Sequence, residues 1–250
     1  MSGFDAADLT HDAFLGGKLY LYQPRNGYRA GIDAVMLSAS IQATKGARVL
    51  ELGCGVGTAI LCLGTRIPGL CLTGVERENG FAELARKNGG DTLEVILADI
   101  DALPMTLRQR QFDHVLANPP FYDRAASIPS KVATREAAHG AQTPLARWVR
   151  VAAKRLAPKG QAHFIHRIAA LPELMRALPN DLGSVEVLPL AARHGRAPDR
   201  FILRARKNGR ADFRLHSPLI LHQGDRHNAA ENRYDPKVQA VLRDGAPLLF

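Results

Sequence analysis

The chain has 250 residues, and its 46% hydrophobic and 23% charged content is ordinary for a globular protein with one large core. No apolar stretch reaches the length of a membrane span, no secretory signal begins the sequence, and the three cysteines lack metal or disulfide spacing, so we expect a cytoplasmic protein. The formal net charge of +9 favours a polyanionic partner over a small acid, because cationic surfaces bind polyanions by releasing counterions.

Residues 1–46 precede the first clear strand pattern, and we expect them to form an N-terminal cap segment. The sequence predicts a short helix over 5–14, a turn at Gly16 and Gly17, an extended run over 19–22 and a helix from Asp33. Asp33 stands directly before an apolar run and is therefore a good N-cap residue for that helix.

From residue 47 to about 170, strand patterns alternate with helix patterns. Strands are predicted at 47–52, 70–75, 93–98, 112–117 and 161–166, and helices at 58–66, 78–88, 143–157 and 171–178. A closing hairpin is predicted from 184–190 and 201–206, and a last helix at 236–244. This alternation predicts a mostly parallel α/β sheet with helices on both faces. No interdomain linker is visible, so we expect residues 47–250 to form a single globular domain.

The first predicted strand runs into a glycine turn, Gly53-Cys54-Gly55-Val56-Gly57, and a predicted helix follows. In that setting the glycines let a nucleotide cofactor approach the backbone and the N-terminus of the helix. Glu76 closes the next strand roughly 20 positions later, which is the spacing of a carboxylate that binds ribose hydroxyls.

Four polar residues follow one another at the carboxyl ends of successive predicted strands: Glu51, Glu76, Asp99 and Asn118. In an open α/β sheet these ends share one rim, where ligands bind. Asp99 is a short acceptor suited to an adenine amino group. Each acid alone is equally well explained as a helix N-cap or a solvated turn residue, but four in phase predict a binding site.

The fourth of these strands ends in Asn118-Pro119-Pro120-Phe121. Prolines end the strand pairing and leave the preceding carbonyls unpaired, Asn118 adds a side-chain oxygen, and Phe121 adds a flat apolar face. Together they can accept hydrogen bonds from a planar NH₂ group and stack on the ring that carries it. An ordinary proline-rich turn explains the tetrapeptide alone equally well. Its combination with the glycine turn favours the interpretation that it binds a planar NH₂ group.

The glycine turn together with Asn118-Pro119-Pro120-Phe121 resembles class I S-adenosylmethionine-dependent methyltransferases that act on amino nitrogens. The N-terminal run over 15–37 and the C-terminal run from Tyr234 resemble the bacterial tRNA(Val) adenine-N6 methyltransferase family. The resemblance implies a Rossmann-like, doubly wound, mostly parallel seven-stranded sheet with an antiparallel last strand. It also implies S-adenosylmethionine as cofactor, S-adenosylhomocysteine as product, and an adenine in a tRNA anticodon loop as target.

The resemblance and the motifs assign roles to individual residues. Asn118, Pro119, Pro120 and Phe121 are expected to hold and stack the reacting base. The expected cofactor-binding residues are Glu51, Gly53, Gly55, Gly57, Glu76, Asp99 and Asn118. The long loop over 118–142 carries Tyr122, Arg124, Lys131 and Arg135, which we expect to contact RNA and close the pocket.

Two groups of basic residues give further candidates for RNA contact. One lies on the helix predicted over 143–157 and includes Arg147, Arg150, Lys154 and Arg155; the other spans 193–214 and includes Arg193, Arg200, Arg204 and Lys207. Either group can instead be a solvated face. The histidines, such as His163 and His166, have no carboxylate or cysteine at ligand spacing, so we expect no metal site. The cysteines are expected to be small buried residues.

Other functions remain open from the sequence alone. The same asparagine-proline chemistry serves methylation of a guanine amino group in rRNA or of a protein glutamine amide, although the basic charge disfavours a protein substrate. A non-catalytic RNA-binding relic of the fold is the alternative of another class. No feature of the sequence sets the oligomeric state, and a monomer is the default expectation.

Overall fold

The computed structural model describes residues 4–120, 143–224 and 233–250, and its centre is one twisted sheet. The strands follow the order β10-β8-β9-β7-β6-β3-β4-β5, and β11 pairs with β8. Their bounds are β3 (Arg48–Leu52), β4 (Cys71–Glu76), β5 (Leu93–Leu97), β6 (Phe112–Ala117), β7 (Leu156–Arg167), β8 (Leu182–Ala191), β9 (Arg200–Lys207), β10 (Arg214–Leu215) and β11 (Leu219–Ile220).

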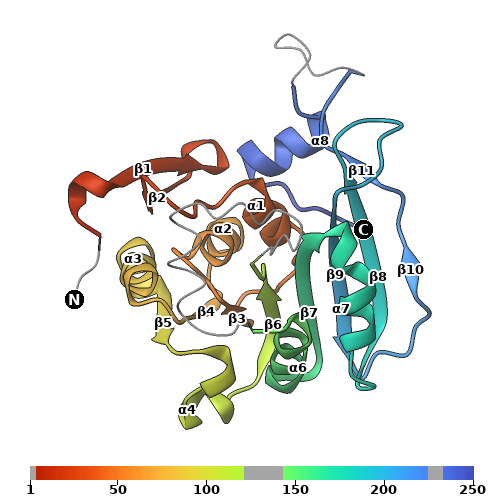
Figure 1. Cartoon of the computed structure of the whole chain (residues 1–250), viewed down its shortest axis with the longest axis horizontal. Helices are drawn as coiled ribbons and strands as arrows, with labels where there is room; N and C mark the ends of the chain where they lie inside the picture. Colours follow the sequence, from red (N-terminus) through yellow and green to blue (C-terminus); the bar gives the residue numbers. More distant parts are fainter. Residues whose placement is uncertain (1–3, 121–142, 225–232) are drawn as a thin grey trace, which may run out of the picture.

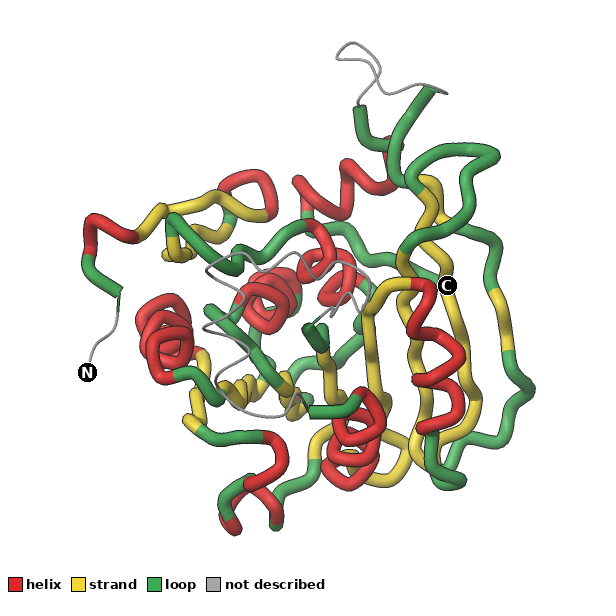
Figure 2. Tube along the Cα trace, viewed as in Figure 1, coloured by secondary structure: helices red, strands yellow, loops and turns green. Residues whose placement is uncertain are grey.

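Helices cover both faces of this sheet, as Figures 1 and 2 show. One face carries α1 (Ile32–Ala39), α2 (Thr58–Arg66) and α3 (Asn79–Gly89), and the other carries α4 (Met105–Arg108), α6 (Leu145–Arg155) and α7 (Leu171–Ala177). Successive strand residues point to opposite faces, so Val49 packs with the first group of helices and Leu50 with the second. Burial on both faces explains why the central strands are continuous apolar runs.

The predicted fold class is confirmed. β3 pairs in parallel with β4 and β6, whereas β9 runs antiparallel between β7 and β8. The predicted number of strands was too low, because the two-residue strands β10 and β11 extend the sheet beyond β8. Segments of two residues are too short to show the apolar pattern of a strand in the sequence. They pair with β8 because its edge offers unpaired backbone groups.

The N-terminal helix predicted over 5–14 is wrong. After the short 3-10 helix η1 (Ala6–Asp8), the chain forms a hairpin of β1 (Leu9–Phe14) and β2 (Leu19–Pro24), joined by the 3-10 turn η2 (Leu15–Gly17). The hairpin lies beside α2 and α3 in Figure 1. Its strands are specified by cross-strand pairs, such as His11 stacked on Tyr22 with ring centroids 4.4 Å apart, which no local pattern reveals. The division at residue 46 stays a prediction.

Asp33 does not cap its helix, contrary to the prediction. The N-cap of α1 is Gly31, and Asp33 lies in the first turn, where its carboxylate accepts a hydrogen bond from Arg200 Nε at 3.2 Å. This ion pair ties α1 to β9 across a long stretch of sequence. Asp33 therefore stabilises the packing of α1 against β9, and Gly31 is the N-cap of the helix.

The C-terminal segment returns to the N-terminal helices. The helix predicted over 236–244 is present as α8 (Pro236–Gln239), which continues as a π-helical turn, η6 (Ala240–Asp244). Val238 and Val241 are buried in the core on the side of α1, and the Leu248 N–H donates to the Ala39 carbonyl at 2.9 Å. The short helices η3 (Gly90–Thr92), η4 (Ile100–Ala102), η5 (Ile168–Ala170) and α4 were not predicted.

Two buried histidines lie in contact between neighbouring strands. His114 Nδ1 of β6 is 3.2 Å from His163 Nε2 of β7, and His163 has no exposed surface. Burial, together with the charges of His114 and Arg204, sets the pKa of His163 well below its usual value, and burial also lowers the pKa of His114. Both imidazoles are therefore neutral in the folded protein near neutral pH.

This pair predicts that the fold loses stability in mild acid. Because the folded-state pKa values are depressed, the unfolded chain binds more protons below about pH 6.5, so the free energy of unfolding falls as the pH drops through that value. Urea unfolding at several pH values measures this slope. The variant His163→Gln should reduce it by up to about 1.4 kcal/mol per pH unit, whereas His194→Gln, at an exposed histidine, should leave it unchanged. Equal slopes in wild type and His163→Gln would contradict the prediction.

Candidate active site

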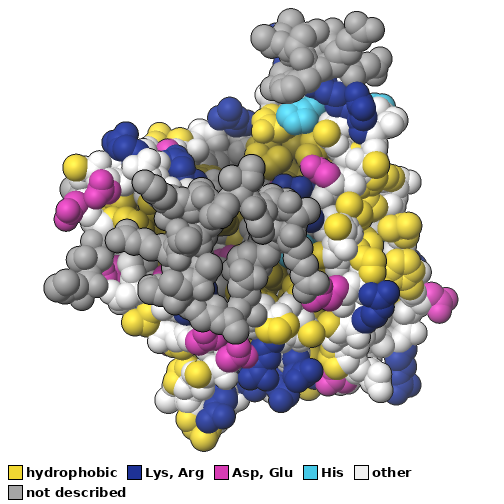
Figure 3. Space-filling model, viewed as in Figure 1, with side chains coloured by type: hydrophobic (Ala, Val, Ile, Leu, Met, Phe, Trp, Pro, Cys, Tyr) yellow, Lys and Arg dark blue, Asp and Glu magenta, His cyan; other side chains and the backbone are white. Residues whose placement is uncertain are grey.

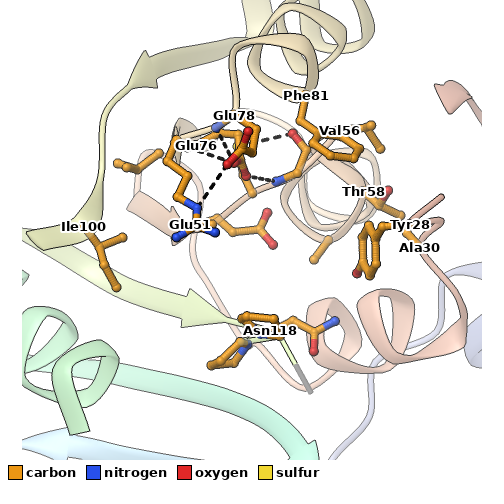
Figure 4. A pocket seen from close by; sticks show the side chains of 18 of the residues that line it. Tyr28, Ala30, Glu51, Val56, Thr58, Glu76, Glu78, Phe81, Ile100 and Asn118 are labelled. Atoms are coloured by element: carbon orange, nitrogen blue, oxygen red, sulfur yellow. Dashed lines mark hydrogen bonds and ion pairs between the residues drawn. The ribbon is translucent and has the colours of Figure 1, made fainter. Parts of the chain in front are cut away.

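A pocket opens at the carboxyl ends of β3, β4, β5 and β6, where the sequence places its polar residues. It is lined by backbone and side chains from the glycine turn, from Glu76 to Phe81 on the way into α3, from Ala98 to Ile100, and from Asn118 to Pro120. In Figure 4, Glu76 and Asn118 lie on opposite sides of the cavity, with Tyr28 at one end and Ile100 at the other. Parallel pairing brings these strand ends together.

At Gly53 the glycine turn approaches its neighbour too closely for a side chain. Gly53 has φ of +64°, and a Cβ there would lie 2.6 Å from Cη2 of Trp148 on α6. Gly55 also has a positive φ, +56°, and its N–H donates to Glu76 Oε2 at 2.9 Å. The turn is therefore packed on one side by a tryptophan and held on the other by a carboxylate, which leaves its backbone facing the pocket.

Glu76 organises the pocket through three backbone donors. Besides Gly55, its other oxygen, Oε1, accepts from the N–H groups of Arg77 at 2.8 Å and Glu78 at 2.9 Å, at the start of α3. The side chain is only 7% exposed. Oε1 already accepts two hydrogen bonds, but Oε2 accepts only from Gly55, so Glu76 retains acceptor capacity on Oε2 for a hydroxyl group of a ligand.

Glu51 adds a second buried carboxyl beside the same cavity. Its Oε2 accepts from the Ile60 N–H at 3.0 Å, and only 3% of the residue is exposed. Burial, reinforced by the charge of Glu76, raises the pKa of Glu51 well above its usual range, although the Ile60 hydrogen bond opposes the shift. A ligand that brings a positive charge into the pocket would offset this cost of ionising Glu51.

Asn118 presents an unsatisfied oxygen at the rim. Among the described residues, the buried atoms Asn118 Oδ1 and Thr58 Oγ1 have no hydrogen-bond partner, and both residues line the pocket. A buried polar oxygen without a partner is costly, so each points to a donor supplied by a ligand. Pro119 is buried and Pro120 exposed, which places the backbone of this motif at the mouth of the cavity.

A hydrogen-bonded network in the hairpin holds Tyr28 against the pocket. The Asp12 carboxylate accepts from Arg29 at 2.7 Å and from Gln23 Nε2 at 2.8 Å, and Gln23 Oε1 accepts from the Ala30 N–H at 2.9 Å. Burial of Asp12 works against ionisation, but these hydrogen bonds prevail and lower its pKa. The network thus fixes the segment between β2 and α1, from which Tyr28 and Ala30 reach the pocket.

Asn88, near the end of α3, joins the hairpin to the glycine turn. Its Nδ2 donates to the carbonyls of Tyr22 and Val56, both at 3.0 Å, and its Oδ1 accepts from the Tyr22 N–H at 2.8 Å. Val56 is the fourth residue of the glycine turn and lines the cavity. A single amide therefore fixes three backbone groups, one of them in the wall of the pocket.

The structure places the sequence-predicted residues as follows. The pocket brings together Glu51, Gly53, Gly55, Glu76, Asp99, Asn118, Pro119 and Pro120. Gly57 does not line it: this glycine is the N-cap of α2, and a Cβ there would meet Leu61 and Leu93. Asp99 caps η4 by accepting from the Asp101 N–H at 2.8 Å, so only part of its acceptor capacity is free. Phe121, Tyr122, Arg124, Lys131 and Arg135 lie outside the described residues.

Among the pocket residues that sequence reasoning missed are Tyr28, Thr58, Phe81 and Trp148. Tyr28 appears in the N-terminal run that carries the family resemblance, which was the available signal. Thr58 follows the last glycine of the turn directly. Nothing in the sequence near Phe81 or Trp148 indicates the pocket, because they reach it only through the packing of α3 and α6.

Several of the cations predicted to contact RNA have partners within the protein. Arg200 pairs with Asp33, Arg204 with Glu186 at 2.9 Å, and Lys207 with Asp181 at 2.5 Å. Arg155 donates to backbone carbonyls at the end of α4. These long-range partners were not visible in the sequence. The cysteine prediction is also wrong in one place: Cys54 and Cys62 are buried, but Cys71, at the start of β4, is exposed.

Within the described ranges, no group of three or more histidine, cysteine or acidic side chains is arranged to hold a metal ion. A search of the same ranges for helices long and apolar enough to cross a membrane finds none.

The Asn88 contacts predict that this side chain positions the glycine turn for cofactor binding. Asn88→Asp removes both donors and sets a carboxylate against two carbonyls, so the affinity for the expected cofactor, S-adenosylmethionine, should fall about tenfold. Isothermal titration calorimetry measures the loss, with the melting temperature recorded alongside. Gln111→Glu, the same chemical change at an exposed position, should bind like wild type. Wild-type affinity in Asn88→Asp would show that the amide only supports the hairpin.

Comparison with known proteins gives the family. Residues 30–189, more than half of the chain, match the family described as methyltransferase small domain. The tRNA1(Val) (adenine(37)-N6)-methyltransferase of Shewanella halifaxensis is 29% identical over 185 residues, which cover 72% of this chain and 74% of that protein. The enzyme of the same name from Haemophilus influenzae is 24% identical over 214 residues, covering 83% and 89%.

A solved structure agrees in fold. The crystal structure of a predicted O-methyltransferase from Agrobacterium tumefaciens superposes with a TM-score of 0.71 at 23% identity, covering 87% of this chain and 99% of that one. At this identity the likeness shows the architecture alone. The predicted cofactor, S-adenosylmethionine, is confirmed by the family match. The chain belongs to the methyltransferase small domain family and is an S-adenosylmethionine-dependent methyltransferase.

Proposed function

We propose that this enzyme methylates the exocyclic N6 nitrogen of an adenine in the anticodon loop of a tRNA in the cytoplasm. The observation that carries the proposal is the buried, unpartnered Asn118 Oδ1 at the rim of the pocket, next to two prolines that cannot donate. This oxygen needs an N–H donor, and an aromatic amino group supplies one. The names of the relatives from Shewanella and Haemophilus, and the net charge of +9, support tRNA as the molecule that carries it.

The pocket suits the cofactor on grounds of charge and shape. Bound S-adenosylmethionine supplies a methyl group activated by the positive charge of its sulfonium. The backbone of Gly53 and Gly55 would lie against it, Oε2 of Glu76 would accept from a ribose hydroxyl, and the free acceptor capacity of Asp99 would meet the adenine amino group. The buried Glu51 would be stabilised in its ionised form by the positive charge.

Asn118 and the Pro119 carbonyl would hold the amino group of the target adenine. The lone pair of this nitrogen is delocalised into the ring, and hydrogen bonds accepted from its two N–H groups shift electron density back to nitrogen. They also fix its direction toward the methyl donor, and such orientation accounts for much of the acceleration in transfers of this kind. No strong base is required, because the nitrogen becomes acidic once it is methylated.

The base must leave its stack to enter this pocket, which costs a few kcal/mol and least from a single-stranded loop. Phe121 is proposed to stack on the extruded base. Tyr122, Arg124, Lys131 and Arg135, on the segment that follows, remain proposed RNA contacts. The enzyme is proposed to act as a monomer.

Methylation of unmodified RNA tests the proposal. The protein is incubated with labelled S-adenosylmethionine and total RNA, and the RNA is digested to nucleosides. Label in N6-methyladenosine from the tRNA fraction is expected. Label in a methylated guanosine of rRNA, or in a glutamine side chain of added protein, would replace the proposed substrate with one of the alternatives. Labelling of neither RNA nor protein would favour an RNA-binding relic.

Asn118→Ala should slow turnover strongly while changing cofactor binding little. The variant removes an acceptor used by the substrate amine, so kcat on tRNA should fall by about 10²- to 10³-fold, comparable to the loss of one preorganised hydrogen bond in other active sites. The Kd for S-adenosylmethionine and for tRNA should change less than about threefold. Near-normal methyl transfer by Asn118→Ala would rule out the assigned role.

Glu76→Ala should act on the cofactor instead. The change frees the N–H groups of Gly55, Arg77 and Glu78 and removes the proposed ribose acceptor, so the Kd for S-adenosylmethionine should rise at least about tenfold. Glu83→Ala, at an exposed carboxylate on the following helix α3, is the matched control and should bind like wild type. Unchanged affinity in Glu76→Ala would remove Glu76 from the ribose contact.

A further inference from the structure

Helix α6 presents two chemically distinct faces. Trp148, Val149, Ala152 and Ala153 are buried in the core against the sheet. Arg147, Arg150 and Lys154 are spaced by three and four residues, so they form one stripe along the opposite side of the helix. The helix contains no acidic residue. Its outer face is therefore a line of cations about 10 Å long.

The cations of this stripe differ in whether an acidic side chain pairs with them. Arg147 pairs with Asp101. Arg150 and Lys154 are exposed, and neither has an ion pair or side-chain hydrogen bond within the described part of the chain. Figure 3 shows Lys and Arg side chains gathered on the part of the surface that α6 occupies in Figure 1. The charge of Arg150 and Lys154 is thus available to a partner.

The stripe of cations begins beside the active-site pocket. Thr143, two residues before α6, lines the pocket, and Arg147 at the start of the stripe pairs with Asp101, the residue that follows Ile100 of the pocket lining. The stripe therefore starts at the rim where the target base would enter and leads away from it along the helix. A strand that stacks at about 3.4 Å per nucleotide would pass about three nucleotides along this length.

We infer that Arg150 and Lys154 on the outer face of α6 bind the sugar-phosphate backbone of the RNA beside the nucleotide that enters the pocket. The inference rests on the proposed function, and it adds where the RNA strand runs on the surface of the enzyme. Arg and Lys bind phosphates as charge-assisted donors, and two of them in line with a pocket set the register of a strand. A lipid surface fits less well, because the apolar face of α6 is already buried in the core.

Binding of tRNA as a function of salt tests the inference. Arg150→Gln with Lys154→Gln removes two phosphate contacts, so tRNA affinity near 0.15 M salt should fall about 20-fold and the salt slope should drop by about 1.5. The Kd for S-adenosylmethionine should stay as in wild type. Lys237→Gln with Arg243→Gln, two exposed cations on the C-terminal helical segment, is the matched control and should change tRNA affinity less than about twofold.

A second measurement locates the contact. An RNA with uncharged methylphosphonate linkages next to the target adenine should bind wild type more weakly but should cost the α6 double variant no further affinity. Additive losses, or a wild-type salt slope in the double variant, would overturn the inference. If the wild type still methylates tRNA while either of these results is found, the proposed function stands and only the proposed course of the RNA along α6 is wrong. Absence of methyl transfer to any RNA by the wild type would instead overturn the proposed function.

Discussion

The carboxylate of Glu76 holds together two loops that would otherwise be independent. It accepts from Gly55 in the turn after β3 and from Arg77 and Glu78 at the start of α3. A carboxylate that satisfies three backbone donors needs no counter-cation in the protein, so the pocket can keep its acceptors for a ligand. Parallel pairing of β3 with β4 sets the distance, since both strands end at the same level.

Support for this pocket comes from elements that precede the sheet in the sequence. The hairpin of β1 and β2 contributes no central strand, yet Asp12 and Gln23 fix the segment carrying Tyr28, and Asn88 ties β2 to the glycine turn. Asn88 bonds three backbone groups, Gln23 accepts from the Ala30 N–H, and Asp12 orients Gln23 by a further hydrogen bond, so the network stiffens the wall of the pocket. Rigidity matters in a methyltransferase because transfer depends on the alignment of two reactants.

The basic residues differ in whether an acidic residue of the protein pairs with them. Arg200, Arg204 and Lys207 are engaged with acids on neighbouring elements, and these ion pairs join strands and helices. The outer face of α6 keeps exposed cations next to the pocket. The basic residues therefore form two groups, one paired within the fold and one that we propose to bind RNA, and only the positions of the acidic residues in space distinguish them.

The sequence determined the order of strands and helices along the chain, the glycine turn and the polar ends of four strands, because short apolar runs and glycine turns are local signals. Tertiary structure alone decided that residues 9–24 form a hairpin, that Trp148 and Tyr28 enter the pocket, and that Asp33 pairs with Arg200. These features depend on contacts between residues far apart in the sequence, and a local pattern contains no information about which distant side chain will be its partner.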